Sequence, residues 1–215
     1  LGFALMGGRN VVGRRPLCAI LVSRLCLIRF RPGLRPSGEN VYILQLRNKM
    51  NITIRNETKH DERVVEEITK RAFWNLHEMG CNEHLIVHEM RKHIDFINDL
   101  DLVIELGGKI IGNIMYTKAF LVDDEGNRID TYPFGPVSID TSYQRKGYGS
   151  KLIIESIVRV KKIGISAIMI YGNPGNYVKF GFVGSKKHQI TNGEGRFPCG
   201  LLVLPLNEND LGKVK

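Results

Sequence analysis

The sequence predicts a single α/β domain built on a central mixed β-sheet. Strand-like and helix-like segments alternate from Met50 onward, which is the order expected of this class. The chain has 215 residues, of which 43% are hydrophobic and 25% are charged, the composition of an ordinary globular domain. A Gly-Gly hairpin joins two of the strand-like runs, and a helix-like segment separates two others.

The first predicted elements are one strand and two helices. Ile52 and Ile54 alternate as a short strand, and Thr58 can cap the helix that follows. A second, shorter helix covers residues 83–91. The first helix has one apolar face, formed by Val64, Val65, Ile68 and Ala72.

Turn signals divide the rest of the domain. Gly107 and Gly108 join two strand-like runs as a hairpin, and a long strand covers Tyr132 to Ile139. A helix follows the next turn and stops at Gly164. Three further elements complete the prediction: a buried strand over residues 167–171, a short helix or turn over residues 173–180, and a last strand from residue 201.

Positive charge is concentrated in residues 1–49. This segment holds eight Arg and Lys49 against Glu39 alone, so it carries +8 of the formal net charge of +9. Residues 50–215 are nearly neutral, which gives no support for a nucleic-acid-binding surface. We expect residues 1–49 to be a basic leader and residues 50–215 to be the folded domain.

The leader has three interpretations. It is translated sequence upstream of a true start at Met50, a disordered basic arm, or a targeting segment. Its Arg-rich, acid-poor composition suits an organelle transit peptide, but only Ser23 and Ser37 supply serine. The apolar run from Leu17 to Val22 is far shorter than the ~20 residues of a membrane span, so we expect no contact with a membrane.

Cysteine and histidine do not indicate a disulfide framework or a metal site. Four cysteines in the whole chain favour a reducing, cytoplasmic location. Cys81, His84 and His88 have the residue types of metal ligands, but structural zinc needs a fourth ligand and the sequence has no Cys-x-x-Cys partner. We therefore expect no metal.

The stretch YQRKGYGSKLI (residues 143–153) predicts an anion-binding turn. A strand that ends in such a turn and leads into a helix leaves backbone N–H groups unpaired at the positive end of the helix dipole. Gly147 and Gly149 let the main chain approach a ligand closely, while Arg145 and Lys146 add positive charge. A diphosphate suits this arrangement better than a single carboxylate.

The same residues do not match either of two common nucleotide-binding motifs. A dinucleotide fingerprint needs a third glycine where Leu152 stands, and a Walker loop needs Gly-Lys-Ser/Thr where the order is Gly149-Ser150-Lys151. The first motif taken alone is weak, so a plain tight turn from strand to helix stays an alternative.

A second motif, IMIYGNPGNYVKFGF (residues 168–182), follows about one strand later. Together, Q-x-x-G-x-G at residues 144–149 and Y-x-x-x-G-F at residues 177–182 resemble the GNAT superfamily of acyl-CoA-dependent N-acyltransferases. The chain is most similar to small bacterial acetyltransferases of unassigned substrate, and the resemblance covers about residues 50–206.

The resemblance implies a splayed central sheet flanked by helices, with acetyl-CoA as co-substrate. The exposed main chain of Val137 to Ile139 would pair with the pantetheine arm like an added strand, and a backbone N–H near Val137 could stabilise the oxyanion. Many family members have an Asn seven residues before the motif Tyr, where this chain has Ile170. The candidate cofactor-binding residues are Val137, Ser138, Ile139, Gln144, Arg145, Lys146, Gly147, Tyr148, Gly149, Ser150 and Asn173.

Tyr177 is the general acid that the resemblance implies. With an ordinary pKa near ~10, its hydroxyl is protonated at neutral pH and could protonate the departing CoA thiolate. The alternative is that its ring only packs the sheet edge beside Phe180 and Phe182. The base stays open among residues that water could connect to the site: Glu83, His84 and Asp130.

The leading hypothesis is an N-acetyltransferase that moves an acetyl group from acetyl-CoA to a primary amine of a small molecule or peptide. The amine attacks directly and forms a tetrahedral intermediate, and the helix over residues 83–91 forms one wall of the acceptor pocket. A non-catalytic acyl-CoA-binding module is the alternative, and nucleic-acid binding through the leader is a third hypothesis. We expect no nucleic-acid partner, and a homodimer stays open.

Overall fold

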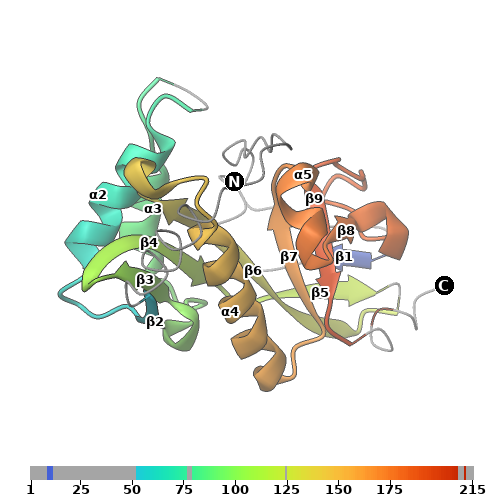
Figure 1. The fold of residues 1–215 in the computed structure, drawn as a ribbon. Coiled ribbons are helices and arrows are strands. Elements are labelled where there is room, and N and C mark those ends of the chain that lie inside the picture. Colours follow the sequence, from blue (N-terminus) through green and yellow to red (C-terminus); the bar gives the residue numbers. More distant parts are fainter. Residues whose placement is uncertain (1–8, 12–51, 77–78, 124, 208–210, 212–215) are drawn as a thin grey trace, which may run out of the picture.

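The computed structural model describes residues 9–11, 52–76, 79–123, 125–207 and 211. These residues form an α/β fold in which helices flank one mixed β-sheet (Figure 1). The strands are β1 (Arg9–Val11), β2 (Ile52–Asn56), β3 (Leu102–Leu106), β4 (Lys109–Tyr116), β5 (Ala119–Asp123), β6 (Arg128–Ile139), β7 (Ala167–Tyr171), β8 (Val183–Gly184) and β9 (Leu201–Pro205). The helices are α2 (Glu62–Phe73), α3 (Glu83–Met90), α4 (Tyr148–Ile163) and α5 (Pro174–Tyr177). The predicted fold class is confirmed.

The sheet has the strand order β2-β3-β4-β6-β7-β9-β8. β5 pairs with the first part of β6, and β1 pairs with β5. All described pairs are antiparallel except β6 with β7, which are joined by a helical crossover through α4. The sheet is therefore mixed, as the sequence predicts.

The sheet opens between β6 and β7. Their parallel pairing covers only Thr131 to Pro133 on β6 and Ala167 to Met169 on β7. Beyond Pro133, β6 remains paired with β4 on its other edge as far as Ile139. The second half of β6 therefore has one edge that β7 leaves uncovered, and this is the splay that the family resemblance implies.

Helices α2 and α4 cover opposite faces of the sheet beside this opening. On β6, the Ser138 side chain contacts Thr69 of α2, whereas the Ile139 side chain faces Gly149 of α4. Successive side chains of a strand point to opposite faces, so the two helices lie on either side of the same stretch of β6. This places one end of each helix next to the opening.

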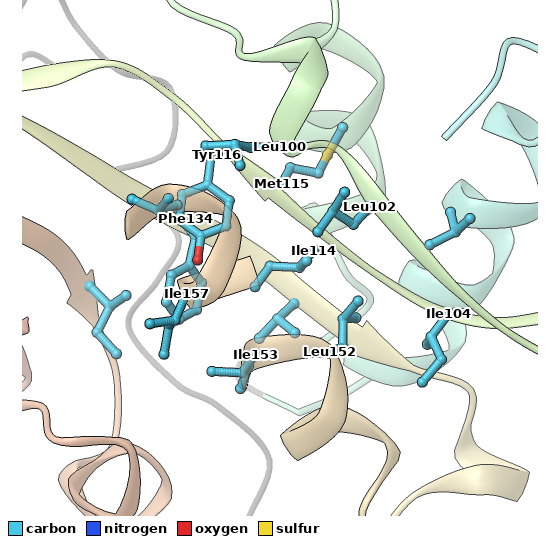
Figure 2. Packing of buried hydrophobic residues seen from close by; sticks show 14 of the residues in the cluster. Leu100, Leu102, Ile104, Ile114, Met115, Tyr116, Phe134, Leu152, Ile153 and Ile157 are labelled. Atoms are coloured by element: carbon cyan, nitrogen blue, oxygen red, sulfur yellow. The ribbon is translucent and has the colours of Figure 1, made fainter. Parts of the chain in front are cut away.

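The main hydrophobic core lies between the sheet and these helices. Figure 2 shows Leu102 and Ile114 from the strands beside Leu152, Ile153 and Ile157 of α4. The apolar pattern of the α4 segment predicts this inward face. The helix ends at Gly164 with a φ of 83°, which confirms the predicted stop.

The N-terminus and the buried face of α2 differ from the prediction. Asp61, not Thr58, precedes the first helical residue, and the Thr58 hydroxyl instead donates to the Asp61 carboxylate (2.7 Å). Val64 is 42% exposed, while Thr69 and Phe73 are buried. The polar Thr69 can be buried because Asn113 and Ser138 are its hydrogen-bond partners, which a hydrophobicity pattern does not reveal.

The predicted long strand starts earlier than expected, at Arg128. Its added residues pair with β5, a strand that the sequence does not separate from the preceding hairpin. The hairpin itself is confirmed, since Gly107 and Gly108 have φ values of 58° and 79° at the turn between β3 and β4.

Most of the predicted leader, together with Met50, lies outside the described residues. Within residues 1–49 only Arg9–Val11 are described, as strand β1 against β5. The interpretation of this segment therefore stays a prediction. Among the described helices, none is long and apolar enough to cross a bilayer.

Candidate active site

The glycine turn links the end of β6 to the start of α4. Gly147 caps the helix with a φ of 87°, and Arg145 has a φ of 59°, so two residues of the turn are left-handed. The first bond within the helix runs from the Lys151 N–H to the Gly147 carbonyl (3.1 Å). The N–H groups of Gly149 and Ser150 precede that bond and have no carbonyl of their own helix to bind. The turn therefore presents backbone donors at the positive end of a 16-residue helix.

A side-chain bond holds the turn against the end of β6. The Gln144 carboxamide donates to the Ile139 carbonyl (3.0 Å), which joins the turn to the last residue of the strand. Gly149 would place a Cβ 3.5 Å from the Ile139 side chain, so helix and strand are already in contact there. The donors of the turn and the uncovered edge of β6 consequently form one continuous surface.

A cleft of about 770 Å³, including its open mouth, lies on this surface. It is lined by parts of β6, the turn, α4, α5 and the end of α2. Most of the predicted site residues line it: Val137, Ser138, Ile139, Gln144, Arg145, Gly147, Gly149, Ser150 and Tyr177. The structure thus brings both sequence motifs to a single cleft.

Three predicted residues do not line the cleft but support its frame. Lys146 donates to the Ser142 carbonyl (2.7 Å). Tyr148 packs edge-on against Tyr143 at 6.3 Å between ring centroids. Asn173 accepts the Gly175 N–H (2.9 Å) and so caps α5. A contact of Lys146, Tyr148 or Asn173 with CoA stays a prediction.

Tyr177 combines a buried ring with a hydroxyl that has no bonding partner among the described residues. Its ring lies 5.9 Å from Phe134 and 5.7 Å from Phe182, and the residue is 1% exposed. Burial raises the pKa of Tyr177 far above its ordinary value, and Tyr116 raises it further. The hydroxyl is therefore protonated at neutral pH and can donate a hydrogen bond.

Gly172 has a role that the sequence analysis did not recognise. A Cβ at this position would lie 2.7 Å from Cε2 of Tyr177, closer than real contacts allow. Gly172 is thus the residue that lets the Tyr177 ring sit against the end of β7. The sequence signal was visible in the Gly172-Asn173-Pro174 break, but it indicated only a turn.

The apolar wall of the cleft comes from α2 and not from α3. Ala72, Phe73 and Leu76 line the cleft, whereas no residue of α3 does. In the described residues α3 packs against α2 and does not reach this cleft. That α3 forms one wall of the acceptor pocket stays a prediction. The sequence marked Ala72 only as part of a buried helix face.

The candidate bases also lie away from the cleft lining. Glu83 accepts the Asn82 N–H (3.1 Å), and His84 Nδ1 faces the Cys81 sulfur (3.5 Å). Asp130 lies in the part of β6 that pairs with β5. The identity of the general base therefore stays open.

Of the three residues weighed as metal ligands, Cys81 and His84 lie together but His88 does not join them. His88 Nδ1 lies 3.0 Å from Glu66 on α2 rather than beside Cys81. Within the described parts of the chain, no three His, Cys, Asp or Glu side chains are grouped as a metal site would need.

Two polar residues line the cleft beyond the predicted set, and one of them, Lys179, adds positive charge beside the turn. Lys179 Nζ donates to the Ser150 hydroxyl (3.0 Å) across the cleft, and Asn176 lies on the same wall. Lys179 stands between the residues of the second motif, where the sequence analysis assigned it no role.

Comparison with known proteins agrees with this geometry. Residues 69–182 match the acetyltransferase (GNAT) family. The uncharacterized N-acetyltransferase YhbS of Escherichia coli K12 is 25% identical over 138 residues, which is 64% of this chain and 77% of YhbS.

Two solved structures have a similar fold. A GNAT family acetyltransferase from Brucella melitensis in complex with acetyl-CoA has a TM-score of 0.60 and 25% identity, covering 74% of this chain and 90% of that one. The YhbS structure from Escherichia coli in complex with CoA has a TM-score of 0.63 and 22% identity, and the match covers 77% of this chain and 87% of that one.

Proposed function

This chain belongs to the acetyltransferase (GNAT) family, and from that premise we propose that it transfers an acetyl group from acetyl-CoA to a primary amine of a small molecule or peptide. One observation carries the proposal. The turn with its backbone donors and the buried Tyr177 line the same cleft, next to the point where β6 and β7 separate. The Brucella relative, which was solved with acetyl-CoA, supports the choice of co-substrate.

The turn and its neighbouring cations are suited to the diphosphate of CoA. The backbone N–H groups at the start of α4 are available to an anion, and Arg145 and Lys179 line the same cleft. Backbone donors and cations together favour a multiply charged ligand. The pantetheine arm would then run along the edge of Val137 to Ile139 that β7 leaves uncovered, as an added strand.

The chemistry follows from the groups that line the cleft. A neutral amine attacks the thioester carbonyl, and the carbonyl oxygen becomes an oxyanion that a backbone N–H near Val137 stabilises. When the C–S bond breaks, the electron pair goes to sulfur, and Tyr177 supplies the proton that converts the thiolate to a thiol. The proton that the amine releases restores the Tyr177 hydroxyl directly or through water.

Acetyl-CoA binding is tested by thermal unfolding of the full chain with and without ligand. Ligand at ~100 times its dissociation constant adds about 2.7 kcal/mol, which corresponds to a shift of roughly 5–10 °C for a domain of this size. The test variant is Ser150→Glu. A glutamate in the first turn of α4 favours the helix, but its charge opposes a diphosphate and engages Lys179.

The matched control adds the same charge to an exposed position of the same helix. Ile154 is 53% exposed on α4 and does not line the cleft, so Ile154→Glu should keep the shift that Ser150→Glu loses. Equal shifts in both variants would remove the turn from the binding site. An amine screen then follows, and binding without turnover of any amine would favour a non-catalytic acyl-CoA-binding module. A homodimer and a cytoplasmic location stay predictions.

A further inference from the structure

Asp140 shapes the anion-binding turn from within. Its Oδ1 accepts the Ser142 N–H (3.0 Å), and its backbone carbonyl accepts the Tyr143 N–H (2.8 Å). Its own N–H donates to the Ile111 carbonyl of β4 (2.8 Å), so the residue is bound both to the sheet and to the turn. Asp140 is also buried, with 6% of its surface exposed.

The charge of Asp140 is unfavourable for the ligand that the turn is proposed to hold. It is the one acidic residue in the sequence from Ile139 to Ser150. Burial opposes its ionisation, but hydrogen bonds from Ser142 and Arg71 keep the pKa of Asp140 below its ordinary value. Asp140 is therefore a carboxylate at neutral pH, and it would repel a diphosphate.

Arg71 provides the counter-charge from a segment distant in sequence. Its Nη2 donates to Oδ2 of Asp140 at 2.8 Å, while Oδ1 stays with the turn. Arg71 lies in the last turn of α2, and the two residues that follow it, Ala72 and Phe73, line the cleft. The ion pair thus lies at the junction of the turn and the apolar wall.

Two lysines near the turn, Lys146 and Lys109, have different partners. Lys146 donates to the Ser142 carbonyl, and its Nζ lies 5.5 Å from the Tyr143 ring centroid. Lys109 Nζ lies 5.3 Å from the centroid of the same ring, and its charge also lowers the pKa of Asp140 at longer range. Of these cations, Arg71 is the one whose side chain forms an ion pair with Asp140.

We propose that Arg71 is a positioning residue that sets the affinity for acyl-CoA by neutralising Asp140, so that a carboxylate can shape the turn without repelling the diphosphate. This inference rests on the proposed function. The proposal predicts that removing the Arg71 charge and removing the Asp140 charge change the affinity for acyl-CoA in opposite directions. Without Arg71 the buried carboxylate repels the ligand, whereas without the Asp140 charge Arg71 is released to attract it.

Three variants of the full chain separate this role from simple structural support. A unit charge left uncompensated at roughly 10 Å from the two charges of a diphosphate corresponds to about tenfold in affinity, at an effective dielectric of about 20 and with screening over one Debye length. We expect Arg71→Met to weaken acetyl-CoA binding about tenfold. Asp140→Asn keeps an acceptor for the Ser142 N–H and should bind at least as tightly as the unaltered protein. The double variant should return to within about threefold of it.

Isothermal titration with acetyl-CoA at about 50 mM and about 300 mM salt measures these affinities. The deficit of Arg71→Met should shrink at the higher salt, because screening weakens a charge effect but not a packing defect. Arg63→Met is the matched control, since Arg63 lies on the same helix, is 90% exposed and pairs with Glu67. Its affinity should not change.

Three sets of binding results would contradict the proposed role of Arg71 or the function on which it rests. If Arg71→Met binds as tightly as the unaltered protein, or if the double variant stays as weak as Arg71→Met, the inference is wrong. Weak binding in all three variants would assign the pair a purely structural role and would also overturn it. If the unaltered protein itself does not bind acetyl-CoA, the proposed function is wrong and this inference falls with it.

Discussion

Substituting alanine for Gly172 should push the Tyr177 ring out of its place. The added Cβ would lie 2.7 Å from Tyr177 Cε2 and 3.3 Å from Cδ2, whereas ordinary contacts begin near 3.4 Å. The backbone at Gly172 does not have the left-handed φ that would by itself penalise alanine. The steric conflict with one ring is therefore the main effect of the substitution.

The size of the effect follows from the packing around that ring. Tyr177 would have to move by about 0.7 Å, but Phe134 and Phe182 enclose it and it is 1% exposed. Overpacking of this kind costs about 1–3 kcal/mol, or roughly 2–4 °C in Tm for each kcal/mol in a domain of this size. A displacement of that order also moves the hydroxyl, so the rate of acyl transfer should fall at least tenfold.

Urea unfolding measures the coupling between Gly172 and Tyr177 when it is applied to the unaltered protein, Gly172→Ala, Tyr177→Leu and the double variant. The substitution Gly172→Ala should cost 1–3 kcal/mol in the unaltered protein and about zero, or a gain of up to ~1 kcal/mol, in a Tyr177→Leu background. Gly184→Ala is the control, because a Cβ there meets no atom within 4 Å and the φ is −61°. An equal cost in both backgrounds would refute the steric argument.

Two other predictions concern buried polar groups. Tyr177→Phe should lower kcat by ~10²-fold or more with little change in acetyl-CoA affinity, and an unchanged kcat would exclude Tyr177 as the acid. The same variant should keep the free energy of unfolding or raise it by up to ~1 kcal/mol, because it removes a buried hydroxyl that has no partner among the described residues. Asp101→Asn should stabilise the protein increasingly from pH 5 to pH 9. Burial, and then the nearby Glu57, raise the pKa of Asp101 to about 9. The folded state thus holds a proton that the unfolded state releases above ~4, and the stability of the unaltered protein falls with pH over that interval. Urea unfolding at several pH values checks this, and parallel pH profiles for the two proteins would contradict it.

Much of the fold could be predicted because its signals are local. Gly107 and Gly108 adopt the positive φ that their turn requires, and Gly164 ends α4 in the same way. These outcomes depend on the backbone freedom of single residues, which the amino-acid type alone reveals. The apolar periodicity of α4 likewise predicts its buried face before any neighbour is known.

Prediction was less successful where burial depends on a partner. Thr69 reads as a polar position, yet it is fully buried because its hydroxyl bonds to Asn113 and Ser138 across the α2–sheet interface. Val64 reads as core and is exposed, since α2 turns its other side to the sheet. A strand as short as β8, with two residues, carries too little pattern to be recognised.

The candidate site divides in the same way. The turn with Gly147 could be read from the chain because a tight turn has a characteristic local sequence, whereas Tyr177 was identified through the family resemblance of the two motifs together. The end of α2 carries no such signal, and neither does the contact between Gly172 and the Tyr177 ring.

The sequence by itself determined the family, the mixed α/β class, the glycine turn before α4 and the position of the tyrosine in the second motif. The turn rests on the backbone conformation of a few residues, and the family rests on the order of two short motifs along the chain. Tertiary structure alone decided that both motifs line one cleft and that Arg71 meets Asp140, 69 positions away. Charge neutralisation and ring packing act through space over a few ångströms, and only the folded chain brings such distant residues that close.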